Sequence, residues 1–379
     1  MELNSELNLK EIVRTYKSNY SKIFHEFITV QSDFLSDIYN RYNKDLDAAN
    51  IVLYFARNLH EKTLRERDRD LDFNISFEKF WDNADKTKQD NRRIVDIAES
   101  TGLPKETARR KVNNLIKSKV LVKNKTYITW CPPLDQRKSY IAVVDRQINQ
   151  ISKLVQFIAI HLEFKISKDK INVELKKHFS FFWYHYIKTQ LGYLKMWQEE
   201  FNDLELILIA LQVVIQANLA YRKKDVSYEN HFASTPNNIK FKNEKDNSVS
   251  ATSISEVTGV PRATCIRKLE KLNRMKIVRK DMQSKRYYVD LKNLQSNALN
   301  SRRISENTIQ MFSEFYSIDD YRNIHIFSKI CNFTNVKLYI FQHGRISKNL
   351  KYQKTLKNLE FEEYFVWNNY FKGKLILFN

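Results

Sequence analysis

The side chains best spaced for chemistry lie in two closely similar stretches of the chain, residues 97–115 and 254–272. Nine residue identities, including the pattern Thr-Gly-x-Pro, return at matching positions without a gap, 157 residues apart. Both stretches combine Lys and Arg with Thr, and the first adds Asn. These groups donate hydrogen bonds to phosphate oxygens and to the edges of bases. The chemistry that they predict is recognition of a nucleic acid.

The basic residues of the chain concentrate in the same two places. The 379 residues carry a formal net charge of +20, of which residues 105–125 contribute +7 and residues 262–286 contribute +8. A composition rich in Lys, Asn and Ile is also typical of AT-rich genomes. Codon bias alone, however, would not place most of the charge on two repeated motifs. The sequence therefore predicts a polyanion as the partner.

The residues around each basic stretch predict two helices joined by a tight turn. In the first copy, residues 94–101 have helical apolar spacing, Gly102 supplies the backbone freedom of the turn, and Pro104 begins the next helix, where its missing N–H costs nothing. That second helix turns its apolar positions inward, so its basic positions face outward. Two short β-rich runs around a polar turn follow at residues 120–130 and 277–289, and they predict a hairpin in each copy.

Two helices followed by a hairpin resemble the bacterial winged helix-turn-helix superfamily, notably MarR-like and IclR-like transcriptional regulators. The resemblance covers residues 92–130 and 249–290 and rests on the stretch Thr-Gly-[Leu/Val]-Pro-[Lys/Arg]-x-Thr. It implies a mainly α fold with small β-hairpin wings, in which tandem winged helix-turn-helix domains are joined by helical segments. It also implies that the second helix of each copy enters the major groove of double-stranded DNA.

The resemblance further implies which side chains contact DNA. On the second helices they are Lys105, Thr107, Arg109, Arg110, Asn113, Arg262, Thr264, Ile266, Arg267 and Lys271. On the basic hairpins, which suit phosphate or minor-groove contact, they are Lys123, Lys125, Lys280, Lys285 and Arg286.

The two copies differ at one outward position. Ile266 stands where the first copy has Arg109, so we expect the copies to prefer different half-sites, with the Ile side chain against a thymine methyl group. Simpler interpretations exist for other positions. Arg110 and Arg267 are alternatively solvated helix charges, and Thr107 and Thr264 alternatively support the turn without touching bases.

The duplication extends beyond the motifs, because residues 45–51 resemble residues 203–209 at nearly the same shift. We expect four regions. They are N-terminal helices with a first winged-helix domain at residues 1–133, a helical and aromatic connecting region at 134–200, a second winged-helix domain at 201–291, and a helical C-terminal tail of unknown role at 292–379.

Two apolar segments have competing interpretations. The run at residues 204–220 contains four polar side chains and is shorter than the roughly 20 apolar residues of a membrane span, so it predicts a buried helix. That helix is either domain core or the seam of a homodimer. The aromatic run at residues 179–186 predicts core or a subunit interface, and a small-molecule effector would bind within residues 157–197.

The sequence disfavours catalysis and metal binding. Its three Cys are far apart without a C-x-x-C pair, its eight His form no H-E-x-x-H pair, and five Gly are few for phosphate-binding loops. We therefore expect no enzyme activity and no cofactor. The N-terminus lacks the pattern of a signal peptide, so we expect a cytoplasmic, nucleoid-associated protein without a membrane partner.

The function predicted from these residues is sequence-specific binding of double-stranded DNA by a transcriptional regulator. One alternative is a plasmid- or phage-type replication initiator, which also carries tandem winged helices. The other is a non-enzymatic chromosome-organising or scaffold protein, for which basic residues on both second helices would not be needed.

Overall fold

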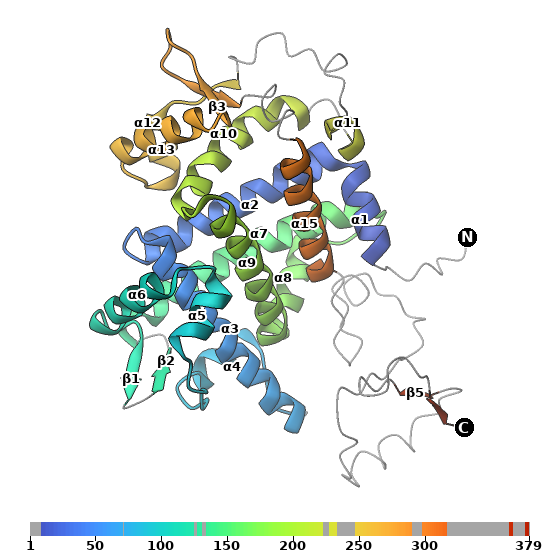
Figure 1. Ribbon diagram of the computed structural model, residues 1–379. Helices are drawn as coiled ribbons and strands as arrows, with labels where there is room; N and C mark the ends of the chain where they lie inside the picture. The colour runs from blue at the N-terminus through green and yellow to red at the C-terminus, as the bar shows by residue number, and fades with distance from the viewer. Residues whose placement is uncertain are drawn as a thin grey trace.

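A computed structural model describes residues 9–70, 72–124, 127–130, 134–222, 227–232, 247–289, 298–316, 364–366 and 376–378. In this part of the chain the protein is mainly helical, and its strands form small antiparallel pairs (Figure 1). The expectation of a mainly α fold is confirmed at this level.

The elements form two series that repeat in the same order. The first series is α1 (Leu9–Ser18), α2 (Tyr20–Arg41), α3 (Leu46–Arg69), α4 (Phe77–Asn83), α5 (Ile94–Thr101), α6 (Lys105–Lys117), β1 (Val122–Asn124), β2 (Tyr127–Thr129) and, after the 3₁₀ turn η1 (Leu134–Gln136), α7 (Arg137–His161). The second series is α8 (Lys168–Lys177), α9 (Phe179–Phe201), α10 (Leu204–Arg222), α11 (Tyr228–Phe232), α12 (Ala251–Thr258), α13 (Arg262–Arg274), β3 (Val278–Lys280), β4 (Tyr287–Val289) and α15 (Ala298–Tyr316).

This order differs from the division expected from the sequence. Residues 134–200 are helical, as expected of a helical connecting region, but in the repeated order α7 is the last element of the first series and α8 and α9 are the first elements of the second. The sequence hid this because the repeated motif marks only the middle of each series. The helices on either side keep their order without keeping recognisable residues.

The C-terminal region is helical only in part. The helix α15 lies where a helix is expected, but Tyr364–Val366 (β5) pairs antiparallel with Ile376–Phe378 (β6). The expectation of a helical tail does not hold at β5 and β6, whose β-branched and aromatic residues favour strands. The sequence Val-Lys-Leu-Tyr-Ile-Phe-Gln at residues 336–342 also suggests a strand, and these residues lie outside the described part of the chain.

The helices of the two series are intermixed, because several helices of each series pack mainly against helices of the other. The helix α3 packs most extensively against α9 of the other series, and α10 packs most extensively against α2. In the same way, α1 of the first series packs against α15 of the second, and α7 of the first series packs against α8 of the second. One contiguous hydrophobic core runs through both series.

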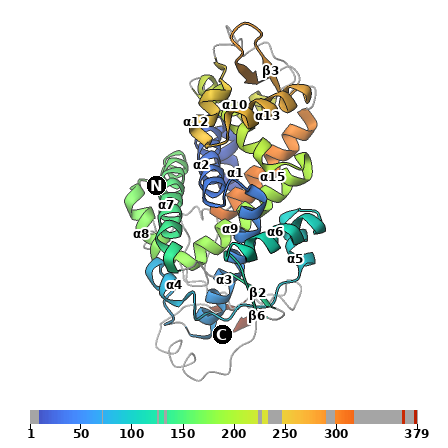
Figure 2. The same ribbon diagram turned by 90° about the vertical axis from the view of Figure 1, so that its left-hand side faces the viewer.

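We call α5, α6, β1 and β2 the first head, and α12, α13, β3 and β4 the second head (Figures 1 and 2).

Each head has a two-stranded hairpin in simple antiparallel register. Val122 pairs with Thr129 in the first hairpin, and Val278 pairs with Val289 in the second. Both hairpins follow directly on the longer helix of their head, as the sequence predicts.

The tight turn in each head depends on a left-handed glycine. Gly102 follows α5 with φ of 71° and Gly259 follows α12 with φ of 73°, a region that residues with a Cβ enter at a cost. Each glycine also lies against the C-terminal part of a long helix from the other series. Gly102 approaches Gln198 of α9, and Gly259 approaches Asn40 of α2.

Replacing the two glycines should therefore have unequal effects. Gly102→Ala is expected to destabilise the protein by about 1 kcal/mol through the positive φ alone, and Gly259→Ala by about 2 kcal/mol. A Cβ at Gly259 would lie 2.6 Å from Asn40 Oδ1, whereas the nearest atom at Gly102 is Lys195 Cγ at 3.3 Å. Asn40 would have to rotate away from the Thr258 carbonyl oxygen, to which it donates at 3.4 Å.

Urea denaturation of the two variants measures this difference. Adding Asn40→Ala to both backgrounds is the control, because it should bring the two losses together. Equal losses in the presence of Asn40 would contradict the expectation.

Candidate nucleic-acid interface

The helix α6 presents a polar face to solvent because its apolar residues are spaced to reach the core. Ala108, Val112 and Leu115 are buried on the inner side. On the outer side four of the expected DNA contacts are exposed and Thr107 is half-buried; the exposed four are Lys105, Arg109, Arg110 and Asn113. The structure thus brings the five predicted residues of this helix onto one accessible face.

On that face Arg109 is paired with Glu106. The Glu106 carboxylate oxygen Oε2 accepts from Arg109 Nε at 3.0 Å and from Nη2 at 2.7 Å. The two side chains are 61% and 73% exposed, so the pair contributes little stability. What it does is present a donor fork beside an acceptor at the surface. Sequence reasoning did not single out Glu106.

The helix α13 has a different outer face. Arg262 and Arg267 are exposed, and Thr264 is half-buried. Arg262 Nε donates to the Thr252 hydroxyl at 3.0 Å, which joins the helix to α12. Ile266 is only partly exposed, because part of its side chain packs against the core. The expectation that Ile266 faces outward is therefore met only in part.

At the position equivalent to Glu106, the second head has the exposed Ala263. The polar pair of the first head is thus replaced as a whole by two apolar side chains.

Some basic side chains on α13 form ion pairs inside the protein. One of them, Lys271, was expected to bind DNA, and Lys268 lies close to it on the same helix. Lys268 Nζ lies 2.6 Å from Asp203 Oδ1 and 3.2 Å from Glu205 Oε2. Lys271 Nζ lies 3.4 Å from Asp203 Oδ2. Lys271 was expected to contact DNA, but its position one turn along the same helix face directs it toward the N-terminus of α10.

The first head repeats this arrangement. Lys111 Nζ lies 2.5 Å from Asp45 Oδ2 and 4.0 Å from Asp47 Oδ2, at the N-terminus of α3. Asp45 also caps α3 by accepting from the Ala48 N–H at 3.0 Å, and the corresponding Asp203 accepts from the Leu206 N–H at 3.2 Å. We call Asp45, Asp47, Asp203 and Glu205 the acidic cluster.

The two ends of this cluster are close enough to influence one another. Burial raises the pKa of the Asp47 carboxyl, Lys111 opposes the rise, and the carboxylates of Asp45, Asp203 and Glu205 add to it. Residues of both series therefore surround one acidic centre. A signal for it was present in the sequence, since Asp-Leu-Asp at residue 45 and Asp-Leu-Glu at residue 203 recur with the basic motif.

One basic side chain of the second hairpin, Lys280, also forms an ion pair inside the protein. Lys280 Nζ lies 2.6 Å from Glu270 Oε1, and the Tyr287 hydroxyl donates to the same oxygen at 2.7 Å. These two groups hold the pKa of Glu270 below its ordinary value. Lys280, expected to contact DNA, is thus tied to α13, because a carboxylate lies within its reach.

The remaining hairpin residues differ in availability. Arg286 donates to Ser248 through Nε at 3.0 Å and through Nη2 to the carbonyl oxygen at 2.6 Å, so its guanidinium positions the segment before α12. Lys285, at φ of 56°, and Lys123 are exposed. Lys125 lies outside the described residues.

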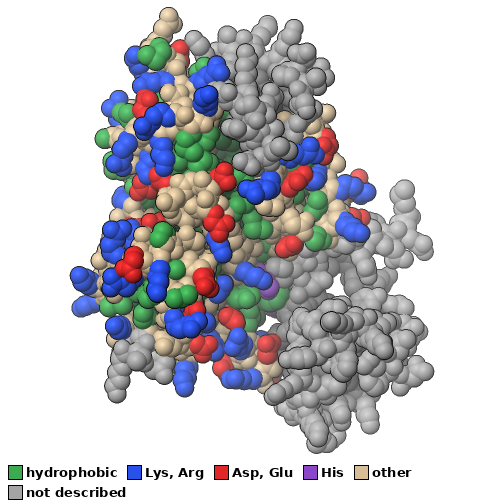
Figure 3. All heavy atoms as spheres, viewed as in Figure 1, with side chains coloured by type: hydrophobic (Ala, Val, Ile, Leu, Met, Phe, Trp, Pro, Cys, Tyr) green, Lys and Arg blue, Asp and Glu red, His purple; other side chains and the backbone are tan. Residues whose placement is uncertain are grey.

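The accessible basic residues of both heads gather on one side of the molecule. In Figure 1, α6 and α13 lie toward the left-hand edge, and Figure 2 shows them one above the other on that side. Lys and Arg side chains cluster over both heads in the space-filling view (Figure 3). No protein-family model, curated protein or solved structure matches this chain. Its functional interpretation therefore rests on the residues and geometry of the two heads.

The aromatic region suggested for an effector is packed as core. Phe179, Phe182, Trp183 and Tyr186 are buried, which confirms the core interpretation of the aromatic run. The cavity that they line holds about 10 Å³, room for about one water molecule. A ligand could enter this cavity only by displacing these side chains. An open pocket of about 660 Å³, lined by residues 156, 160 and 163–167, lies at the start of the range 157–197 expected for an effector.

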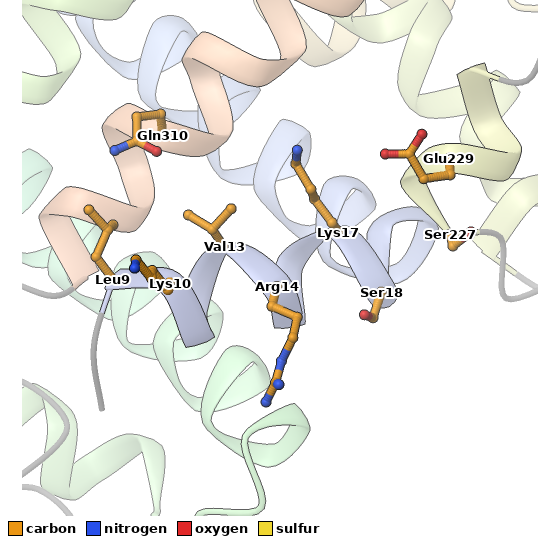
Figure 4. Close-up of a pocket in the computed structure, with 9 residues that line it drawn as sticks. All are labelled: Leu9, Lys10, Val13, Arg14, Lys17, Ser18, Ser227, Glu229 and Gln310. Carbon is orange, nitrogen blue, oxygen red and sulfur yellow. The ribbon is translucent and has the colours of Figure 1, made fainter. Parts of the chain in front are cut away.

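A larger pocket of about 640 Å³ opens between α1, α11 and α15, to the right in Figure 1. Figure 4 shows Lys17 rising between Gln310 and Glu229, whereas Arg14 points out of the pocket. The Lys17 ammonium also lies 4.8 Å from the centre of the Tyr228 ring. Because the Glu229 carboxylate lines the same pocket, its wall carries charges of both signs.

Among the described residues, no three His, Cys, Asp or Glu side chains are placed to bind a metal ion. Within the same residues no single helix combines the length and apolarity needed to cross a membrane; α9 and α10 meet that criterion only as a pair bent by 98°. The apolar run at residues 204–220 forms α10, whose residues from Leu204 to Ile209 are largely buried in the core.

Proposed function

We propose that this protein binds double-stranded DNA sequence-specifically through two winged helix-turn-helix heads on one chain. The observation that carries the proposal is the duplicated pair α6 and α13. Each follows a tight glycine turn, buries one apolar face and presents exposed Arg on the other, on the same side of the molecule. A helix so presented fits the major groove, with its N-terminal residues nearest the base edges.

The side chains then divide by role. Arg109, Arg110 and Asn113 on α6 and Arg267 on α13 are placed to reach base edges or the nearest phosphates. Lys105 and Arg262 are the first residues of these helices and so also lie nearest the duplex, whereas the hairpin residues Lys123 and Lys285 are placed for the backbone. Arg110 and Arg267 occupy equivalent positions, so they are the matched pair for testing the two heads separately.

We further propose that the protein acts by binding alone, as a transcriptional regulator at the chromosome. A regulator requires DNA recognition and no catalytic centre. This requirement agrees with the concentration of positive charge on the two recognition helices and their hairpins. An inverted repeat in a promoter that the protein occupies would support this role; binding confined to arrays of direct repeats beside its own gene would favour a replication initiator.

Selection of binding sites from random duplex DNA tests the proposal. We expect one motif, bound with an affinity that falls roughly a thousand-fold or more between 50 and 200 mM salt, because two heads neutralise on the order of 8 to 12 phosphates. Arg110→Ala and Arg267→Ala should each relax a different half of the motif, at about 1 to 3 kcal/mol. Recovery of no motif, or affinity that does not change with salt, would refute the proposed function.

A further inference from the structure

The contacts between the two series are reciprocal. The partner of α3 is α9 and the partner of α10 is α2, where α3 corresponds to α10 and α2 to α9. The pairs formed by α1 with α15 and by α8 with α7 follow the same rule. Reciprocal contact of this kind defines an approximate two-fold axis, as in the self-complementary interface of a homodimer.

From this geometry we infer that the DNA site consists of two unlike half-sites in inverted orientation, at one fixed separation, and that a single chain reads both. The inference rests on the DNA binding proposed above and adds the arrangement of the site. Two-fold related recognition helices read inverted half-sites, whereas heads related by translation would read direct repeats.

The orientation of the heads in the structure supports the inverted arrangement. Figure 1 shows the hairpin of the second head at the top of the molecule and that of the first head toward the bottom, with α13 and α6 between them. The heads thus point their hairpins away from each other along one face. A duplex lying on this face would meet the two recognition helices in opposite directions.

Fixed separation follows from how the heads are held. Lys111 of α6 and Lys268 of α13 both bind the acidic cluster, in which the ends of α3 and α10 come together. Each lysine therefore anchors its recognition helix to the long helix of its own series, α3 or α10. Movement of one head relative to the other would therefore have to separate α3 from α9 or α10 from α2, the most extensive helix contacts in the described part of the chain.

Buried polar contacts between the series strengthen this connection. Gln212 of α10 donates to the Ser32 hydroxyl of α2, and Asn218 of α10 donates to the Ser21 carbonyl oxygen at 3.3 Å. Sliding of α2 along α10 would leave these groups buried without partners, at a cost of about 1 to 3 kcal/mol each. A flexible link between the heads is thus incompatible with the packing.

The two half-sites differ because the outer faces of α6 and α13 carry different side chains. The first head presents the Glu106–Arg109 pair, and the second presents Ala263 and Ile266 at the same positions. Arg pairs with guanine and Glu accepts from cytosine, whereas apolar side chains contact the thymine methyl group. The inverted repeat is therefore imperfect, with a G·C pair on one side where the other side has A·T.

Binding of the full chain to a designed set of duplexes tests the inference. The reference duplex carries the selected motif; the others carry 5 or 10 extra base pairs between its halves, or have one half reversed. We expect each change to lower affinity at least about 100-fold, because one head then meets nonspecific DNA. Sedimentation of the reference complex should give one chain per duplex.

Arg267→Ala is the matched control, because a protein with a weakened second head should distinguish these duplexes far less. Undiminished binding after a 10-base-pair insertion or after reversal, or a complex of two chains per duplex, would overturn the inference while leaving DNA binding intact. Failure to select any motif would instead count against the proposed function.

Discussion

Lys268→Met is expected to lower the free energy of unfolding by about 2 to 3 kcal/mol, whereas Arg267→Met, one residue earlier, should change it by less than about 0.5 kcal/mol. The Lys268 side chain is only 12% exposed, and it faces the carboxylates of Asp203 and Glu205. Its removal leaves two partly buried negative charges beside Asp47 without their closest counter-ion. Arg267, in contrast, is exposed to solvent.

Urea unfolding and DNA affinity measured on the same two variants should give opposite rankings. Lys268→Met destabilises the fold, and Arg267→Met weakens specific DNA binding in a protein of nearly unchanged stability. Lys111→Met provides a third point with a smaller loss than Lys268→Met, because Asp45 and Asp47 are more exposed than their counterparts. If Arg267→Met proved the more destabilising variant, the assigned roles of these neighbours would be wrong.

The second large effect is expected from exchanging the outer faces of the recognition helices. The double substitution Glu106→Ala with Arg109→Ile should lower affinity for the selected motif roughly 10- to 100-fold, corresponding to about 1 to 3 kcal/mol for one base-pair contact. Stability should hardly change, because both side chains are largely exposed and their ion pair is screened by water.

A repeated selection with this variant measures the change in sequence preference. The half-site of the first head should become similar to that of the second, so that the imperfect inverted repeat becomes more symmetric. The reciprocal variant, Ala263→Glu with Ile266→Arg, should shift the other half toward G·C; circular dichroism would check its folding, since Ile266 is partly packed against the core. An unchanged motif in both variants would place base recognition elsewhere.

The sequence was sufficient to predict the heads because their determinants are local. Gly102 and Gly259 permit the turns, a proline immediately precedes each longer helix, and apolar spacing decides which face of α6 and α13 is buried. These features act over a few residues, so they can be recognised in one dimension. The exposed positions of Lys105, Arg110 and Arg267 follow from the same spacing.

What the sequence left open depends on contacts between distant residues. The resemblance to winged helix-turn-helix proteins implied that Lys271 and Lys280 reach DNA, but the carboxylates that hold them are evident only in the structure. For Lys271 the partner is Asp203, 68 residues away. The packing of α2 against α10 and of α9 against α3 was likewise not predictable. An amphipathic sequence indicates which face of a helix is buried but not which other helix covers that face.

The exchange of helices also constrains the order in which the molecule is completed during synthesis. The chief partner of α3 is α9, which begins about 110 residues after α3 ends. At a ribosomal rate of about 5 to 20 residues per second, the apolar face of α3 waits on the order of 5 to 20 s for the helix that covers it. The first head therefore cannot mature as an independent unit. Shielding of α3 by a chaperone would be of most use in that interval, before the second half of the chain has emerged.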